Sequence, residues 1–303
     1  KLSSGHKSIS LRTSNTKWNK ILFPGTIWLD KGKNQLNLEI EDIPAGDQIN
    51  MSVYSIEIST EKAVAQNDAF AKVLRSKPKW LTHARYGLFF HWNARSMPRS
   101  GLPKSYEEAV NDFDVVKFSS MVHATGADFI VLTTSWDLLT FPAPLKSLDK
   151  ILPGNTTSRD LIADLSSALA KWNIKLMIYC NFRINAMGWK KEDRLIPGKT
   201  DSAFDKMLSI YKEIGRRYAG RIGGVWIDDG MGLYPYNAPF KAITSALKHY
   251  DKDIVVGYNS WVYPRFTDFQ DFYCGEEGIT AAAAVNDSNY LAKDGDGYFV
   301  SRP

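Results

Sequence analysis

Two pairs of neighbouring acidic residues are the positions in this sequence best suited to chemistry. Asp228 and Asp229 directly follow an apolar run at 225–227 with strand character, and Glu276 and Glu277 form the second pair. Glycoside hydrolysis uses two carboxyl groups, one that attacks the sugar or activates water and one that protonates the leaving oxygen. Because successive strand residues point to opposite faces, Asp228 and Asp229 cannot share one role. We expect Asp228 to react and Asp229 to support it.

Each acidic pair also has a simpler structural interpretation. An aspartate at a strand end, such as Asp228, can cap a helix or form a salt bridge, and it can serve as a general base or metal ligand instead of a nucleophile. Glu276 and Glu277 can form a solvated acidic turn. The strand-tip position of Asp228 favours the catalytic interpretation, because parallel α/β barrels build their active sites at the carboxyl ends of their strands.

Residues suited to carbohydrate binding follow other apolar runs. His91 and Trp92 end the run at 87–90, and an imidazole beside an aromatic ring offers hydrogen bonds to sugar hydroxyls and an apolar surface to sugar C–H groups. His91 can alternatively be a core histidine, and Asn181 can tie neighbouring strand tips together. The predicted substrate-binding residues are His91, Trp92, Trp136, Asp137, Asn181, Trp226 and Asn259.

Other functions have no signal in the sequence. The histidines occur singly and no His-Glu-x-x-His is present, so we predict no metal, and no glycine-rich nucleotide or phosphate motif indicates a cofactor. The net charge of +5 is scattered without a dense basic block, which argues against nucleic acid as a partner. No apolar run approaches the ~20 residues of a membrane span. Cys180 and Cys274 lie in strand-like runs and are predicted to be buried thiols.

Alternating strand and helix patterns beyond residue 79 must position these residues. Strands are predicted at 86–91, 128–134, 175–180, 224–228, 254–259 and 269–275. Helices are predicted at 115–125, 159–172, 203–218 and 239–250, with Ser158 as the N-cap of the second. Such alternation is typical of a parallel sheet with helical crossovers.

The predicted fold class is α/β, a (β/α)8-type TIM barrel. Polar residues at the ends of nearly every predicted strand favour a barrel, because an open sheet gathers its ligands at one switch point. About six strands fit before Pro303, whereas a barrel needs eight in ~250 residues. We therefore expect the barrel to be truncated at the C-terminus.

Three segments are predicted in the chain of 303 residues. Residues 1–60 contain short strand-like runs separated by turn sequences and are expected to be part of a β-sandwich accessory module. Residues 61–79 are expected to form a helical linker and residues 80–303 the incomplete catalytic barrel. The chain begins at Lys1 without an initiator Met or a signal-peptide core, so we expect a mature or truncated product of a secreted or periplasmic protein.

Four motifs, taken in order, resemble the α-L-fucosidases of glycoside hydrolase family 29. They are Arg-Tyr-Gly-Leu-Phe-Phe-His-Trp at 85–92, Gly-Ala-Asp-Phe-Ile-Val-Leu-Thr-Thr at 126–134, Ser-Arg-Asp-Leu at 158–161 and Val-Trp-Ile-Asp at 225–228. The resemblance covers roughly residues 79–277 and implies a retaining mechanism on a (β/α)-barrel. It makes Asp228 the nucleophile and His91 a contact to sugar hydroxyls. Glu276 or Glu277 is the nearest match to the family's acid/base glutamate.

The sequence departs from the family at the sugar-binding positions. Trp136 and Asp137 stand where the family usually has a pair of histidines that hold fucose, and Asn93 stands where the family has glycine. An anion and an indole in place of two imidazoles change which pattern of hydroxyls fits. The resemblance therefore supports glycosidase chemistry in this chain more strongly than it supports specificity for fucose.

The function we predict is that of a retaining, exo-acting α-glycosidase. It would remove terminal α-L-fucose or a related sugar from a glycan or oligosaccharide, with neither nucleic acid nor a membrane as partner. The sequence indicates no oligomeric state. Two other functions stay open: a non-catalytic carbohydrate-binding protein on a degenerate glycosidase barrel, suggested by the lost histidine pair, and an interaction protein whose acidic residues are structural.

Overall fold

The chain divides into two compact units, Lys1–Ile58 and Ser59–Pro303. The structure is a computed structural model, and it describes residues 2–4, 7–9, 27, 29–38, 58–136, 138–182, 198–228, 233, 236–259, 267–274 and 299–300. None of the described helices combines the length and the apolar content needed to cross a membrane. The predicted segment boundaries at residues 60 and 79 stay predictions.

The first unit contains a small antiparallel sheet. Its strands are β1 (Leu2–Ser4), β2 (Lys7–Ile9) and β3 (Asn37–Leu38), in the order β2-β1-β3. The register pairs Leu2 with Ile9 on one side and with Leu38 on the other. A sandwich needs a second sheet packed on the first. The described residues of this unit supply one sheet, so the β-sandwich module stays a prediction.

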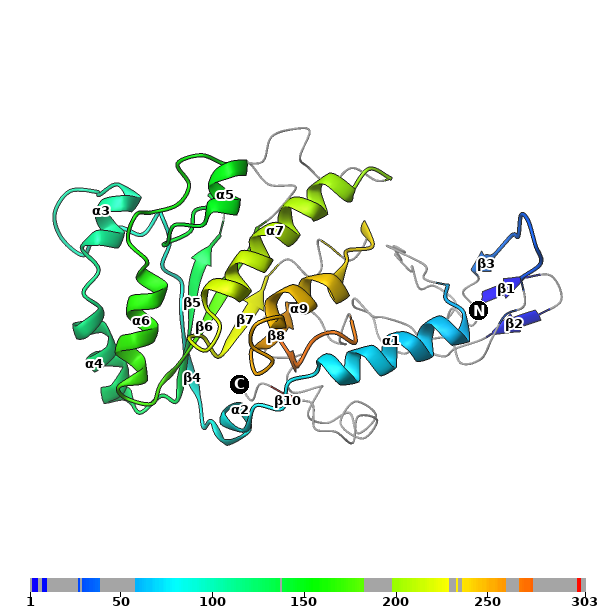
Figure 1. Cartoon of the computed structure of the whole chain (residues 1–303), viewed down its shortest axis with the longest axis horizontal. Helices are drawn as coiled ribbons and strands as arrows, with labels where there is room; N and C mark the ends of the chain where they lie inside the picture. Colours follow the sequence, from blue (N-terminus) through cyan, green and yellow to red (C-terminus); the bar gives the residue numbers. More distant parts are fainter. Residues whose placement is uncertain are drawn as a thin grey trace, which may run out of the picture. The chain divides into compact units, whose positions relative to one another are not determined.

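A parallel sheet forms the centre of the second unit, which confirms the predicted α/β class (Figure 1). Its strands lie side by side in chain order, and every neighbouring pair is parallel. Parallel strands in this order need crossovers of one hand, which carry all connecting helices to the same face. The strands are β4 (Gly87–Phe90), β5 (Phe129–Ser135), β6 (Lys175–Cys180), β7 (Gly224–Ile227) and β8 (Val255–Tyr258).

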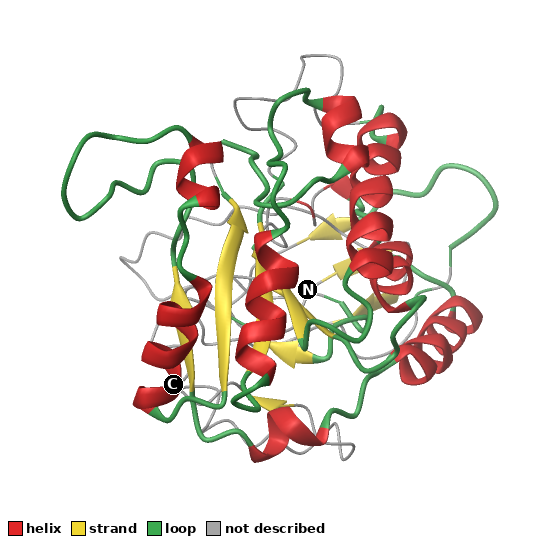
Figure 2. Ribbon diagram, turned by 60° about the vertical axis from the view of Figure 1, so that its left-hand side comes forward, coloured by secondary structure: helices red, strands yellow, loops and turns green. Residues whose placement is uncertain are grey.

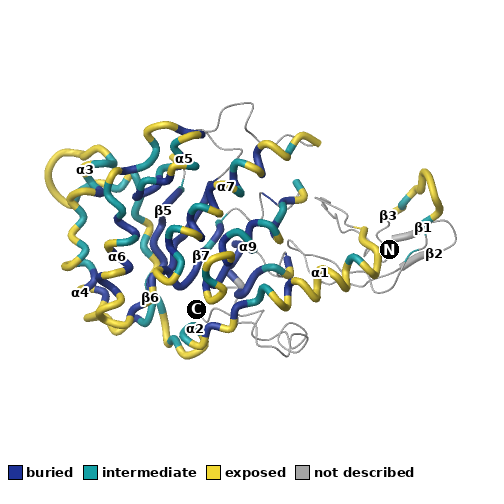
Figure 3. The backbone as a smooth tube through the Cα atoms, viewed as in Figure 1, coloured by how far each residue is buried: buried dark blue, intermediate teal, exposed yellow. Residues whose placement is uncertain are grey.

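Helices cover one face of this sheet, as the crossover rule requires (Figure 2). Strand residues on that face, such as Ile130, Ile178 and Val225, are fully buried beneath the apolar sides of the helices. Figure 3 shows burial concentrated along the strands and along the helix sides that meet them. The connecting helices are α4 (Val115–Thr125), α6 (Leu161–Ala170), α7 (Asp201–Arg217) and α9 (Phe240–Lys248).

The opposite face of the sheet carries a second cluster of large side chains, because strand residues alternate between faces. Helix α2 (Lys79–His83) packs against this face at the edge where the parallel strands begin. There the Trp80 ring centroid lies 5.7 Å from that of Phe129, the first residue of β5. The buried members of the second cluster are Val131, Met177, Tyr179, Val255, Phe272 and Cys274.

Several short elements were not predicted as separate elements. Helices α3 (Tyr106–Asn111) and α5 (Lys146–Ile151) have six residues each, which is less than two helical turns and shows no apolar periodicity. The predicted linker contains α1 (Glu61–Leu74) and the beginning of α2.

The predicted sixth strand contains β9 (Phe272–Tyr273). The N–H of Asp271 donates to the Val256 carbonyl oxygen at 2.7 Å, which places β9 beside β8. Strand β9 pairs in parallel with β10 (Phe299–Val300).

The N-cap of α6 differs from the predicted one. Asp160, rather than Ser158, accepts the N–H of Ala163 at 3.0 Å. The N–H of Ser158 instead donates to Glu107 Oε2 at 3.1 Å, and its hydroxyl donates to the same carboxylate. These hydrogen bonds hold the pKa of Glu107 below its ordinary value. The prediction of Ser158 as the cap was wrong because the carboxylate of Glu107, far away in the sequence, accepts the hydrogen bonds of Ser158.

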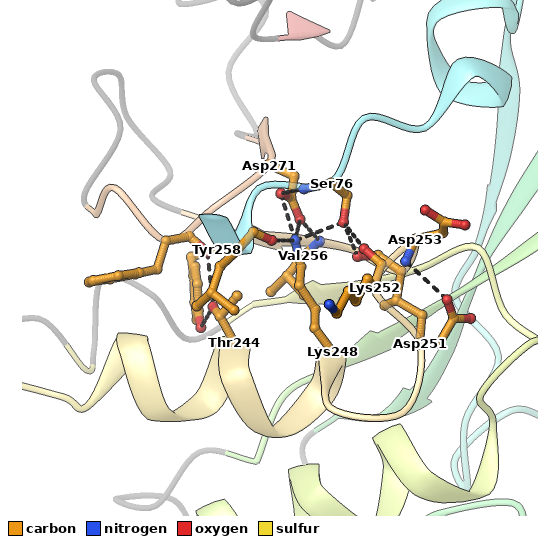
Figure 4. Close-up of polar contacts among 12 residues, drawn as sticks. Ser76, Thr244, Lys248, Asp251, Lys252, Asp253, Val256, Tyr258 and Asp271 are labelled. Atoms are coloured by element: carbon orange, nitrogen blue, oxygen red, sulfur yellow. Dashed lines mark hydrogen bonds and ion pairs between the residues drawn. The ribbon is translucent and has the colours of Figure 1, made fainter. Parts of the chain in front are cut away.

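A buried ion pair joins α9 to the residue before β9, beside the end of α1 (Figure 4). Lys248 Nζ lies 2.5 Å from Asp271 Oδ2, and the two side chains are 2% and 1% exposed. Asp271 also accepts the N–H groups of Ser76 at 2.8 Å and Val256 at 2.7 Å, and Lys248 donates to the Leu74 carbonyl oxygen at 2.8 Å. Burial lowers the pKa of Lys248 and raises the pKa of Asp271.

Candidate active site

Three polar residues stand in a row at the carboxyl edge of the parallel sheet. Asn181, Asp228 and Asn259 are each the first residue after a strand, namely β6, β7 and β8. Their backbone N–H groups continue the sheet ladder: Asn181 to Ser135 O at 2.8 Å, Asp228 to Cys180 O at 2.9 Å, Asn259 to Ile227 O at 2.7 Å. The ladder therefore fixes a carboxylate between two amides on neighbouring strands.

The carboxylate of Asp228 accepts hydrogen bonds on both oxygens. Asn181 Nδ2 donates to Oδ2 at 3.0 Å, the Tyr179 hydroxyl donates to the same oxygen, and Asn259 Nδ2 donates to Oδ1. An ionised carboxylate is an acceptor only, so this set of donors matches the charged form and fixes its orientation. Asp228 is half-buried. The arrangement presents a preoriented carboxylate at the strand tips.

The described groups around the Asp228 carboxylate are hydrogen-bond donors, not the oxygen or nitrogen ligands that a metal site has. Phenol and amide hydrogens point at both oxygens, whereas a cation would need oxygen lone pairs there. Within the described part of the chain, no three His, Cys, Asp or Glu side chains gather as metal ligands would.

An aromatic wall lies beside Asp228 on the face of the sheet away from the connecting helices. The Phe89 ring centroid is 5.5 Å from that of Tyr179 and 5.5 Å from that of Trp226, both in edge-to-face contact. The ring centroid of Trp226 lies 6.0 Å from that of Phe272, which extends the wall. The indole Nε1 of Trp226 is buried without a hydrogen-bond partner among the described residues. Phe89 is 41% exposed, so the wall offers an accessible apolar surface.

His91 lies at the tip of β4, next to this wall. Its ring centroid is 4.9 Å from that of Phe89, 5.5 Å from that of Tyr179 and 6.0 Å from that of Trp136. Its Nδ1 lies 3.0 Å from Thr133 Oγ1. Tyr179 thus contacts both His91 and Asp228, and it brings the two predicted site residues together.

Trp92 has a different environment from its neighbour His91. Its ring lies 5.2 Å from Phe113 and 6.0 Å from Tyr106, and it packs against the hydrophobic cluster on the helix-covered face. The alternation of side chains along an extended strand accounts for this, since His91 faces the other way. The structure therefore does not bring Trp92 to Asp228.

Four of the residues singled out in the sequence lie outside the described residues: Asp137, Asp229, Glu276 and Glu277. The two cysteines are confirmed as buried free thiols. Cys180 is on the helix-covered side, and burial raises its pKa to about 12, which suppresses thiolate formation.

Two residues with clear contacts in the site, Tyr179 and Thr133, were not among the predicted substrate-binding residues. Tyr179 lies two positions before Asn181 and so shares its face of the sheet, a signal that strand alternation contains. Thr133 lies beside His91 because the register pairs Phe90 with Leu132, one residue earlier on each strand. The face of Tyr179 can be read from β6 alone, but its hydrogen bond to Asp228 and the contact of Thr133 with His91 depend on the neighbouring strands.

No protein-family model and no curated protein matches the sequence. Similar solved structures include the α-L-fucosidase AlfC from Lactobacillus casei in complex with α-L-fucose product, at 22% identity, with 66% of this chain and 75% of that chain covered and a TM-score of 0.47. A bacterial fucosidase with a pyrrolidine-triazole inhibitor has 16% identity, coverages of 66% and 51%, and a TM-score of 0.45. The endo-fucoidan hydrolase MfFcnA4 from glycoside hydrolase family 107 has 12% identity, coverages of 75% and 39%, and a TM-score of 0.49.

Proposed function

We propose that this protein is a retaining, exo-acting α-glycosidase that removes terminal α-L-fucose or a related sugar from glycans, on a (β/α)-barrel scaffold. The observation that carries the proposal is the carboxylate of Asp228, held at a strand tip by three hydrogen-bond donors and flanked by an aromatic wall. Barrel enzymes build their active sites at this end of the strands. The described strands, in unbroken chain order with helices on one face, support the barrel.

In the proposed mechanism Asp228 attacks the anomeric carbon and forms a covalent ester with the sugar. The bond to the leaving oxygen breaks, and Glu276 or Glu277 gives its proton to that oxygen. The same glutamate then takes a proton from water, which attacks the anomeric carbon and releases Asp228. The amides of Asn181 and Asn259 would hold the nucleophile in line throughout, because both are fixed by the sheet ladder.

The aromatic wall supports a sugar with an apolar substituent. Phe89, Tyr179 and Trp226 present ring surface next to the nucleophile, and such surface favours C–H groups over hydroxyls. His91 would bind hydroxyl groups at one side. Fucose carries a methyl group where most hexoses carry a hydroxymethyl group, so it matches this combination, as the motif resemblance to family 29 also implies.

Covalent trapping tests the proposal directly. The protein is incubated with a slow fluorinated α-L-fucosyl fluoride, digested, and examined by mass spectrometry for a sugar attached to Asp228. In parallel, hydrolysis of a panel of aryl α-glycosides identifies the sugar. We expect a label on the peptide containing Asp228 and hydrolysis of the fucoside or of a close relative.

The control variants separate catalysis from binding. Asp228→Asn should abolish the label and turnover, whereas Asp253→Asn, an exposed aspartate in the turn before β8, should keep both. Binding of fucosyl glycans without hydrolysis and without a label would contradict the proposal and indicate a carbohydrate-binding protein.

A further inference from the structure

The hydroxyl of Thr133 is completely buried beside an exposed histidine ring. Thr133 is 0% exposed, and its Oγ1 lies 3.0 Å from His91 Nδ1. The two residues are neighbours on adjacent strands, and a register shift between Thr133 and Ser135 follows immediately along β5. The register thus places Thr133 next to the imidazole on the face that carries the aromatic wall.

The direction of this hydrogen bond follows from the burial of Thr133. A neutral imidazole has one N–H donor and one acceptor nitrogen, and a hydroxyl can be either partner. His91 is the only hydrogen-bond partner of the Thr133 hydroxyl among the described residues. If Nδ1 carried the proton and donated, the hydroxyl hydrogen would be buried without an acceptor, which buried polar groups avoid. If the hydroxyl donates to Nδ1, both groups are satisfied.

We propose that Thr133 is a positioning residue that donates to His91 Nδ1 and so holds the ring in the tautomer with its proton on Nε2. Nε2 makes no hydrogen bond with any described residue, and His91 is exposed. His91 is then a hydrogen-bond donor to an oxygen of the bound ligand, which in the proposed function is a sugar hydroxyl or ring oxygen. The identity of that ligand rests on the proposed function, but the tautomer does not.

The rings around His91 add a second restraint. Phe89 and Tyr179 lie 4.9 Å and 5.5 Å from the imidazole centroid, with ring planes tilted by 36° and 76°. Trp136 lies at 6.0 Å. These contacts limit rotation of the imidazole, and Thr133 selects which of its nitrogens faces the sheet. The rings and the Thr133 hydroxyl therefore set the orientation of His91 together, and the hydroxyl sets its hydrogen-bonding character.

Nuclear magnetic resonance of isotope-labelled histidine reports the tautomer without any substrate. The His91 signal is assigned by its loss in His91→Gln and recorded at alkaline pH, where imidazole is neutral. We expect the Nε2–H signature in the full chain and in Thr133→Ser, which keeps the hydroxyl. In Thr133→Val, which keeps the shape, we expect a mixture of the two tautomers. The matched control is Thr134→Val, a buried threonine whose hydroxyl donates to Tyr179 O at 2.8 Å instead.

Kinetics of aryl α-L-fucoside hydrolysis supply the second readout. The loss of one neutral hydrogen bond behind a substrate contact should lower kcat/KM of Thr133→Val by about 3- to 10-fold, and Thr133→Ser should restore it. An Nδ1–H signature in the full chain, or a Thr133→Val spectrum identical to that of Thr133→Ser, would overturn the proposal. If Thr133→Val does not fold, the spectrum of the unaltered protein decides alone. The Nε2–H signature in a protein without glycosidase activity would overturn the proposed function and leave the tautomer standing.

Discussion

Asn181 Nδ2 donates a hydrogen bond of 3.0 Å to Asp228 Oδ2, from the strand tip directly beside it. Asn259 repeats the arrangement from the other side, where its amide donates to Oδ1. The backbones of Asn181, Asp228 and Asn259 also extend the hydrogen-bond ladder of the sheet. The sheet, rather than a loop, therefore fixes the position of the carboxylate. A carboxylate held in this way would need little reorganisation to act as the proposed nucleophile.

The first prediction concerns the two amides. Asn181→Ala and Asn259→Ala each remove one donor to Asp228 and leave the backbone ladder intact. A hydrogen bond to a charged group contributes about 1.5–3 kcal/mol, so we expect kcat/KM for an aryl α-L-fucoside to fall by about 10- to 100-fold in each variant. Asn111→Ala, which removes an exposed amide that donates to Glu107, is the control and should stay fully active. Full activity of both strand-tip variants would show that the amides do not orient the nucleophile.

The second prediction separates the hydroxyl of Tyr179 from its ring. Tyr179→Phe removes the donor to Asp228 Oδ2 and keeps the ring that contacts Phe89 and His91. We expect kcat to fall by about tenfold or more, with thermal stability and the affinity for free sugar nearly unchanged. Steady-state kinetics and sugar titration by calorimetry measure the two effects. A large loss of affinity with unchanged kcat would mean that the hydroxyl contacts the sugar rather than the nucleophile.

The strands and longer helices could be predicted because their apolar patterns extend over enough residues. Strand β6 and helix α4 have the predicted bounds, since each is a run of regular apolar spacing between clear polar breaks. Helix α3 was missed although its start has a readable signal. Ser105 and Glu108 form a capping box, and this spacing of serine and glutamate is visible in the sequence.

The site was predicted less completely, because its contacts cross between strands. The positions of Asn181 and Asp228 at strand tips followed from the sequence, but the hydrogen bond between them depends on the register of β6 against β7. The alternation that predicts different roles for Asp228 and Asp229 applies equally to His91 and Trp92, and the structure places Trp92 against α3.

The third prediction concerns the buried ion pair. Lys248→Met leaves the carboxylate of Asp271 buried without its cation, and we expect the free energy of unfolding to fall by about 3–5 kcal/mol. Adding Asp271→Asn removes the charge and keeps an acceptor for the N–H of Ser76, so the double variant should recover part of the loss. Urea unfolding measures both. Lys252→Met changes an exposed lysine nearby and should shift stability by less than about 0.5 kcal/mol. A double variant less stable than Lys248→Met would contradict this account.

The fourth prediction concerns the start of α5, which is capped by a residue of another helix. Leu145 at the N-cap position has no side chain able to accept a hydrogen bond. The carboxylate of Glu213 on α7 accepts the N–H of Lys146 at 3.1 Å, the N–H of Ser147 at 2.7 Å and the Ser147 hydroxyl at 2.6 Å. Burial raises the pKa of Glu213, but the hydrogen bonds from Ser147 and Lys146 outweigh it, and the pKa lies below the ordinary value of 4.5.

The pH dependence of stability follows from this direction. A carboxyl group whose pKa is lower in the folded state stabilises the fold above its unfolded pKa, and the contribution is lost as the pH falls through the folded pKa. Glu213→Gln should therefore lower the free energy of unfolding at pH 7 by about 1 kcal/mol, a value reduced for the partial exposure of the group. The difference from the unaltered protein should shrink as the pH falls from 4.5 through the lower pKa of the folded state, because below that pKa the glutamate is neutral as well. Asp205→Asn, an exposed acid on the same helix, should show neither effect. A deficit in Glu213→Gln that persists at low pH would assign the loss to packing, and the charged cap would then have no part in the stability of α5.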